Sequence, residues 1–193
     1  MHSFNKPRKI LENGISSDAF PAASVQVGSS KSIFWEESFG CLESNNKRSS
    51  ITLDTVFDLA SLTKVVATTT LLMRAVDEDI LLLDTPVKQF FAEWRGVDRE
   101  LVNVHDLLTH TSGLTSHMPF YADCKGRLEF EHAICQLPLE YEPGRSSIYS
   151  DLGFILLGFI LEDLYKTGFE ELFSRLAKSF KWGEICFRPP LSW

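Results

Sequence analysis

The stretch Phe57-Asp58-Leu59-Ala60-Ser61-Leu62-Thr63-Lys64 decides how the rest of this chain is interpreted. It places a serine hydroxyl and a lysine amine at positions i and i+3, where an apolar helical pattern begins. Residues three apart on a helix share a face and lie about 5–6 Å apart at Cβ. In a pocket with little water, such a lysine can lose its charge and accept the serine proton. We therefore predict Ser61 as a nucleophile and Lys64 as its partner.

The Ser-x-x-Lys spacing alone is weak, because the chain also holds it in two polar segments, at Ser3/Lys6 and Ser44/Lys47. Only Ser61 and Lys64 precede a long periodic segment, which predicts a helix to residue 76. The alternative is a surface serine and lysine on an ordinary helix. The apolar positions that we expect to face the core are Leu62, Val65, Val66, Thr69, Leu72, Met73 and Val76.

Length and composition favour one packed domain, or most of one. The chain has 193 residues, of which 44% are hydrophobic and 12% aromatic. Its net charge is −7 without a basic cluster, which argues against nucleic acid or an anionic membrane as a partner. The ten-residue apolar run 152–161 is too short to span a bilayer and predicts a buried core helix.

The four cysteines show no Cys-x-x-Cys spacing, so they predict neither a metal site nor a disulfide framework. The N-terminal segment lacks the apolar core of a signal peptide. We therefore expect a cytoplasmic protein with reduced thiols.

Local patterns predict a helix at 7–17, then strands at 23–27 and 33–39 that form a β-hairpin, then a polar loop at 41–50. Further along, Asn103 is placed to cap a helix with Asp106 in its first turn. Residues 169–180 carry the apolar stripe of a last helix.

Three segments, in order, resemble the serine β-lactamase and penicillin-binding-protein superfamily, closest to class C β-lactamases and their esterase and peptidase relatives. The first is Phe57–Lys64, with the Val-Val-Ala-Thr-Thr-Thr that follows it. The second is Leu107-Leu-Thr-His-Thr-Ser-Gly-Leu114, and the third is Tyr149-Ser150-Asp151, preceded by Pro143-Gly144. The resemblance implies an α+β fold of the β-lactamase/transpeptidase type, with the hairpin as part of an antiparallel sheet.

The resemblance also implies site roles. Tyr149 would share the proton traffic between Ser61, Lys64 and the leaving group. Asp151 would stand at a substrate-binding position where class C enzymes have asparagine. This change replaces an amide donor by an acceptor-only carboxylate, which weakens the case for β-lactam recognition more than the case for acyl transfer. His110 is expected to be structural, and His117 and His132 to be surface or packing residues.

The superfamily's third motif, Lys/His-x-Gly on a strand beside the nucleophile, has no match here. Lys166-Thr167-Gly168 and His110-Thr111-Ser112-Gly113 fit its letters, but neither is expected on a strand, which the oxyanion amide requires. We therefore expect a single incomplete domain over 1–193, truncated at the C-terminus. Within it, 1–50 would hold the helix and hairpin, 51–76 the nucleophile helix, and 77–193 a mainly helical region.

Three interpretations follow. The first is a serine hydrolase that forms an acyl-enzyme on Ser61 with a small-molecule or peptide ester, amide or lactam, and that needs no cofactor. The second is a catalytically inactive remnant that binds a ligand or partner. The third is an unrelated α-helical interaction domain, in which residues 22–39 would not form protected strands. The identity of the substrate and the oligomeric state stay open.

Overall fold

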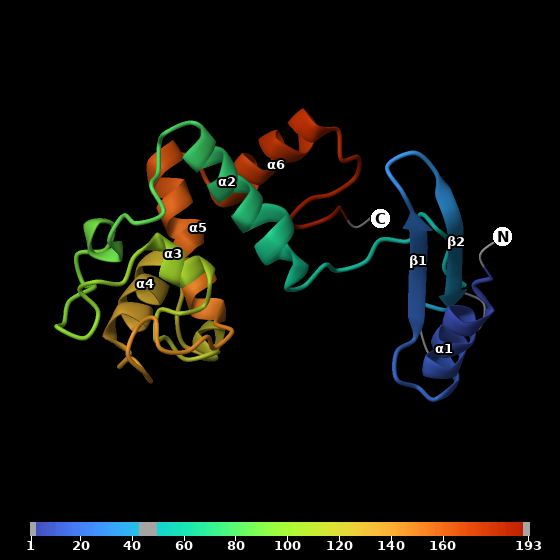
Figure 1. Cartoon of the computed structure of the whole chain (residues 1–193), viewed down its shortest axis with the longest axis horizontal. Coiled ribbons are helices and arrows are strands. Elements are labelled where there is room, and N and C mark those ends of the chain that lie inside the picture. The colour runs from blue at the N-terminus through green and yellow to red at the C-terminus, as the bar shows by residue number, and fades with distance from the viewer. Residues whose placement is uncertain (1–2, 43–49, 191–193) are drawn as a thin grey trace. The chain divides into compact units, whose positions relative to one another are not determined.

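The computed structural model describes residues 3–42 and 50–190. The chain divides into two compact units, Met1–Asp58 and Leu59–Trp193, which we call the hairpin unit and the helical unit (Figure 1). Strands lie in the first unit and helices dominate the second, so the predicted α+β class is confirmed. Most of the predicted polar loop at 41–50, including Ser44 and Lys47, lies outside the described residues.

The hairpin unit consists of α1 (Asn5–Ser16), β1 (Ala22–Gly28) and β2 (Ile33–Gly40). The strands pair antiparallel, with Val25 opposite Glu37. The register is irregular between Val27 and Gly28, next to the turn. These elements confirm the predicted helix and hairpin, with bounds that differ by at most two residues.

Trp35 is the centre of packing in the hairpin unit. It is 9% exposed, and its ring stacks on Phe4 with centroids 5.1 Å apart. Phe39 lies edge-on to it at 6.4 Å. The indole N–H donates to Glu37 at 2.8 Å, and Glu37 also forms an ion pair with Arg8 of α1 at 2.7 Å. One aromatic side chain and one ion pair thus hold α1 on the hairpin.

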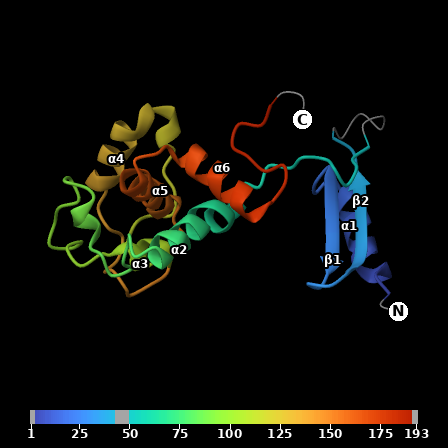
Figure 2. The ribbon, with the colours of Figure 1, turned by 90° about the horizontal axis from the view of Figure 1, so that it is seen from above.

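The helical unit is organised around α5 (Asp151–Tyr165), the predicted core helix. It packs against α2 (Thr70–Asp77), α3 (Val104–Leu108), α4 (Gly126–Gln136) and α6 (Phe169–Phe180) (Figures 1 and 2). Its buried residues lie on more than one face and are Leu152, Gly153, Phe154, Leu156, Leu157, Ile160 and Leu161. Asn103 and Asp106 form the expected capping box at α3, with a 3.0 Å bond from the Asp106 amide to Asn103. Two short 3₁₀ turns complete the unit, η2 (Val87–Gln89) and η3 (Phe120–Ala122).

The nucleophile segment enters α2 through a π-helical turn, η1 (Lys64–Thr69). Two threonine hydroxyls reach back five residues along the chain. Thr69 donates to the Lys64 carbonyl at 2.8 Å and Thr70 to the Val65 carbonyl at 3.1 Å. Such π turns are rare and often occur at functional sites, because the wider turn re-aims the side chains around it.

The predicted core stripe of this helix is wrong in phase. The side chains that are buried are those of Ala67, Thr68, Leu71, Leu72 and Ala75. Of the predicted set, Leu62, Val65 and Met73 are exposed and only Leu72 is fully buried. The segment carries apolar residues around most of its circumference, so periodicity does not select one face. The π turn then shifts the register that a uniform 3.6-residue period assumes.

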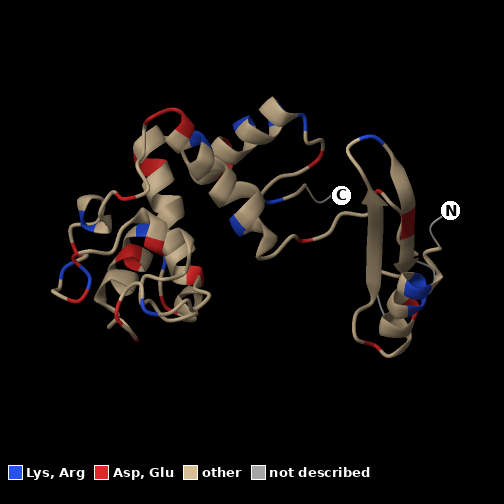
Figure 3. Cartoon of the chain, viewed as in Figure 1, with Lys and Arg blue, Asp and Glu red and all other residues tan. Residues whose placement is uncertain are grey.

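Acidic and basic residues are interspersed along the helical unit (Figure 3). In the part of the chain that the structure describes, no helix is long and apolar enough to cross a membrane.

Candidate active site

Ser61 lies in a tight turn just before η1. Ala60, the residue before it, has φ of +44°, in the left-handed region. That conformation is uncommon for a non-glycine residue and costs about 1–2 kcal/mol. The Ser61 carbonyl accepts the Lys64 amide at 3.1 Å, so the turn leads directly into η1. Backbone strain of this kind clusters at functional sites, where it re-aims a side chain.

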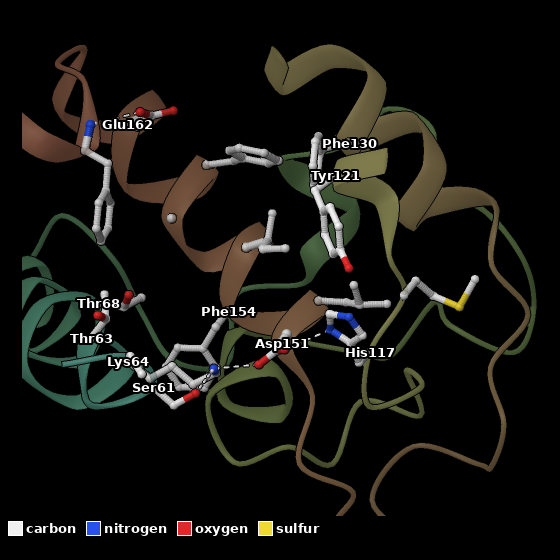
Figure 4. Close-up of a pocket in the computed structure, with 17 residues that line it drawn as sticks. Ser61, Thr63, Lys64, Thr68, His117, Tyr121, Phe130, Asp151, Phe154 and Glu162 are labelled. Carbon is white, nitrogen blue, oxygen red and sulfur yellow. Dashed lines mark hydrogen bonds and ion pairs between the residues drawn. The ribbon is translucent and has the colours of Figure 1, made fainter. Parts of the chain in front are cut away.

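A chain of three interacting side chains, those of Lys64, Asp151 and His117, starts at the Ser61 hydroxyl (Figure 4). The Lys64 ammonium donates to Ser61 Oγ at 3.2 Å and to Asp151 Oδ1 at 2.6 Å. The second carboxylate oxygen of Asp151 lies 3.0 Å from His117 Nδ1. The Lys64 side chain is 15% exposed and that of Asp151 is 37% exposed, so the ion pair is partly shielded from water.

The α5 N-terminus positions Asp151. Ser150 caps this helix, because its hydroxyl accepts the Gly153 amide at 3.4 Å and donates to the Thr115 carbonyl at 2.7 Å. The Ser150 amide donates to His110 Nδ1 at 3.0 Å. His110 therefore uses a ring nitrogen in a contact that holds the 149–151 segment, which is a structural contact of the kind expected for it.

The charges of this cluster favour an ammonium form of Lys64. Burial acts to lower the pKa of Lys64, but hydrogen bonds to Asp151 and Tyr149 outweigh it and raise the pKa above the ordinary value. The hydrogen bond from Lys64 and the contact with His117 hold the pKa of Asp151 below its usual range. The sequence predicts a lysine that can lose its charge in a pocket with little water, and the Asp151 carboxylate opposes that loss.

Tyr149 lies beside both members of the Ser61–Lys64 pair. Hydrogen bonding to Ser61, and then to Lys64, lowers the pKa of Tyr149. The Lys64 ammonium lies 4.8 Å from the centre of the Tyr149 ring, and the His110 ring is 4.7 Å away on centroids. The structure thus brings Ser61, Lys64, Tyr149 and Asp151 together from two segments more than eighty residues apart in sequence.

Sequence reasoning missed His117, which was expected to be a surface or packing residue. No spacing to another residue indicated its contact with Asp151, since that contact depends on how the loop before η3 is folded. The expectation for His132 is consistent with its place on the surface, where it contacts Glu93 at 2.6 Å. Among residues 3–42 and 50–190, no group of three or more His, Cys, Asp or Glu side chains is arranged to hold a metal ion.

The two segments that resemble the third motif by letters alone both lie off strands. Lys166 ends α5 in a left-handed conformation, with φ of +50°. His110, with φ of +62°, lies in the turn that follows α3. Their rejection from the sequence is confirmed.

Comparison with known proteins places these features in a family. The Beta-lactamase family model matches residues 8–181. The N-acetylmuramyl-L-alanine amidase of Bacillus subtilis (strain 168) is 33% identical over 123 residues, which cover 57% of this chain and 28% of that protein.

Solved structures show the same fold. A class C beta lactamase superposes with a TM-score of 0.80 at 24% identity, covering 95% of this chain and 51% of that one. EstCE1, a hydrolase with promiscuous acyltransferase activity, superposes with a TM-score of 0.77 at 19% identity, covering 90% of this chain and 50% of that one. The chain thus spans about half the length of these solved relatives.

An unrelated helical interaction domain is excluded, because the family match extends through the paired strands as well as the helices. The chain belongs to the beta-lactamase family.

Proposed function

We propose that this chain is a serine hydrolase that forms an acyl-enzyme on Ser61 with an ester, amide or lactam. The observation that carries the proposal is the convergence on the Ser61 hydroxyl of the Lys64 ammonium, at 3.2 Å, and the Tyr149 phenol. A nucleophile, a proton acceptor and a fixed positive charge within one site are what acyl transfer needs.

In this mechanism Tyr149 reacts as a phenolate, and the Lys64 ammonium, held by Asp151, favours that ionised form because the two groups carry opposite charges. Ser61 Oγ attacks the substrate carbonyl carbon as its proton passes to the Tyr149 phenolate oxygen, which becomes a phenol. The proton then moves to the leaving group as the acyl–leaving-group bond breaks, which gives the Ser61 ester. Water attacks this ester with the same groups as base and acid, and releases the carboxylic acid.

The Ser61 backbone amide would donate to the oxyanion in the tetrahedral states. The described residues of the helical unit contain no strand that could supply a second donor. Asp151 is proposed as a substrate-binding residue as well, because its carboxylate lines the same pocket as Ser61.

The second candidate is an inactive remnant that binds a ligand, and the Lys64–Asp151 ion pair favours it. At 2.6 Å this contact holds Lys64 as an ammonium, which cannot itself accept the serine proton. The choice between the two candidates therefore rests on whether Tyr149 can act as the base.

Intact-mass spectrometry after incubation with a fluorophosphonate tests the proposal. We expect a single adduct on the wild-type chain that is lost in Ser61→Ala and strongly slowed in Tyr149→Phe. Ser147→Ala is the matched control, since this exposed serine donates to the Thr109 carbonyl at 3.2 Å. Adduct formation that survives Ser61→Ala would overturn the assignment of the nucleophile. Absence of any adduct on a folded chain would favour the remnant.

The setting of this activity is also a proposal. Cys41, Cys124, Cys135 and Cys186 are all free in the structure. Free thiols are compatible with the reducing cytoplasm, which is where we place the protein.

A further inference from the structure

A pocket of about 510 Å³ opens beside the Ser61 hydroxyl within the helical unit (Figure 4). Ser61, Lys64 and Asp151 lie at one end of it. From there the pocket follows α5 as far as Glu162 and Phe169. This volume falls in the range of sites that bind small molecules. A group attached to a carbonyl at Ser61 would therefore have room to extend along α5.

The walls of this pocket are mainly hydrocarbon and aromatic. The pocket runs along α5, with Thr63 and Thr68 of the nucleophile segment on one side and Tyr121 and Phe130 of the 118–130 segment on the other (Figure 4). Such walls favour apolar groups, because each buried methylene gains transfer free energy on leaving water. The apolar and aromatic residues of the lining are Ala60, Met118, Tyr121, Phe130, Leu152, Phe154, Ile155, Phe159 and Phe169.

The charged side chains of the lining are already bonded to the protein. Lys64 and Asp151 bind each other at 2.6 Å, and Asp151 also contacts His117. At the far end, Glu162 accepts the Phe169 amide at 2.9 Å and contacts Arg127 at 3.4 Å. A polar group that extended from Ser61 to this far end would give up water without gaining Glu162 as a free partner, and that loss is costly.

We propose that this pocket binds an apolar acyl group, a medium-length alkyl chain or an aryl ring, of an ester that Ser61 attacks. The inference deepens the proposed function and rests on it. Ser61 and the apolar wall line one continuous cavity, so the carbonyl carbon can lie at the hydroxyl while the acyl group extends along α5.

Gly158 provides a way to fill the pocket without touching the reacting groups. It lies in α5 among the lining residues, and a Cβ built on it would meet the Phe169 ring at 3.7 Å, an ordinary contact. Helical residues other than glycine suit its backbone, so Gly158→Leu should fold and occupy part of the pocket. Gly168→Leu is the matched control, because Gly168 lies outside the lining and a Cβ there meets nothing within 4 Å.

The test measures the rate of Ser61 adduct formation, by intact mass, with fluorophosphonates that carry ethyl to octyl chains. We expect the wild-type rate constant to rise about three- to fourfold for each added methylene until the pocket is filled. Gly158→Leu should abolish this rise, because its side chain would occupy the space that the longer chains need. Gly168→Leu should keep the rise, and Gly158→Ala should reduce it partially.

The outcomes separate the two proposals. A flat or falling dependence on chain length in the wild type overturns the apolar pocket but leaves Ser61 as a nucleophile. Absence of all adducts overturns the proposed hydrolase, and octanoate then probes the pocket directly by calorimetry. Octanoate binding that exceeds acetate binding and is lost in Gly158→Leu supports the pocket. Failure to bind octanoate overturns it.

Discussion

The helical unit and the hairpin unit differ in how much apolar surface they bury. In the helical unit a continuous cluster of buried side chains surrounds α5. Among the described residues of the hairpin unit, the buried hydrophobic residues are Trp35 and Ile51. A two-stranded hairpin is marginal in water unless further strands or a helix cover it. The helical unit thus carries its own core, whereas α1 is held on the hairpin by the contact of Trp35 with Phe4, the residue before α1, and by the Arg8–Glu37 ion pair.

The candidate site is held rigidly because its residues lie on the packed helices of the helical unit. Asp151 begins α5, and Lys64 begins η1, which runs into α2. Both helices belong to the buried cluster. We therefore expect amide hydrogen exchange to be slow in α5 and fast in β1 and β2. Equal protection of the two units would break this comparison.

The largest expected effect comes from the core of the helical unit. Leu157 is 0% exposed in α5, so Leu157→Ala removes buried methyl groups and leaves a cavity. We expect the free energy of unfolding to fall by about 3–5 kcal/mol. Urea denaturation followed by circular dichroism measures this change. The matched control is Leu128→Ala, at a position 80% exposed in α4, where a change below about 0.5 kcal/mol is expected.

We expect the hairpin unit to unfold independently of the helical unit. Trp35→Ala removes the stacking on Phe4 and the hydrogen bond to Glu37. We expect the hairpin to lose about 2–3 kcal/mol, less than a fully buried tryptophan, since its neighbours are only partly buried. Hydrogen exchange should then show β1 and β2 unprotected while α5 keeps its wild-type rates. Loss of protection in α5 as well would mean that the two units unfold together.

The Lys64–Asp151 ion pair should contribute less to the free energy of unfolding than the packing of Leu157 or of Trp35. Asp151→Asn removes the carboxylate that accepts from Lys64, and exposure limits the loss to about 1 kcal/mol at pH 7. The Asp151 pKa is depressed, so its contribution is present above the unfolded-state pKa of about 4 and is lost as pH falls through the folded value. The Lys64 pKa is raised, so its contribution is present below about 10.4 and is lost as pH rises through the folded value.

Two measurements check this prediction. Urea denaturation from pH 3 to pH 10 should show the largest difference between wild type and Asp151→Asn in the middle of the range. NMR titration of the labelled Lys64 side chain should show a lower pKa in Asp151→Asn than in wild type. A Lys64 pKa that does not change would mean that Asp151 is not what holds its proton.

The strand and helix positions were accessible from the sequence, because alternation at 23–27 and the all-apolar run at 152–161 depend on local chain geometry. The catalytic candidates were accessible through motif resemblance. The contact of His117 and the apolar lining of the pocket could not be predicted from the sequence. They join segments that lie far apart in the chain, and no local pattern indicates that these segments meet. The sequence predicts a neutral Lys64 because it indicates a substrate-binding role for Asp151 and does not show that the two side chains are in contact. That contact keeps Lys64 charged.

The smallest expected effect concerns which face of the nucleophile helix is buried. It tests directly where the apolar pattern of the sequence predicts the wrong face. Leu72 is 1% exposed and Met73, its neighbour, is 66% exposed, although both were placed on the core stripe. Met73→Gln should therefore change the free energy of unfolding by less than about 0.5 kcal/mol, as for other surface positions. Leu72→Ala in the same urea assay should cost several times more. A fall of 2 kcal/mol or more in the free energy of unfolding of Met73→Gln would show that Met73 is buried in solution. The predicted core stripe would then be correct at this position.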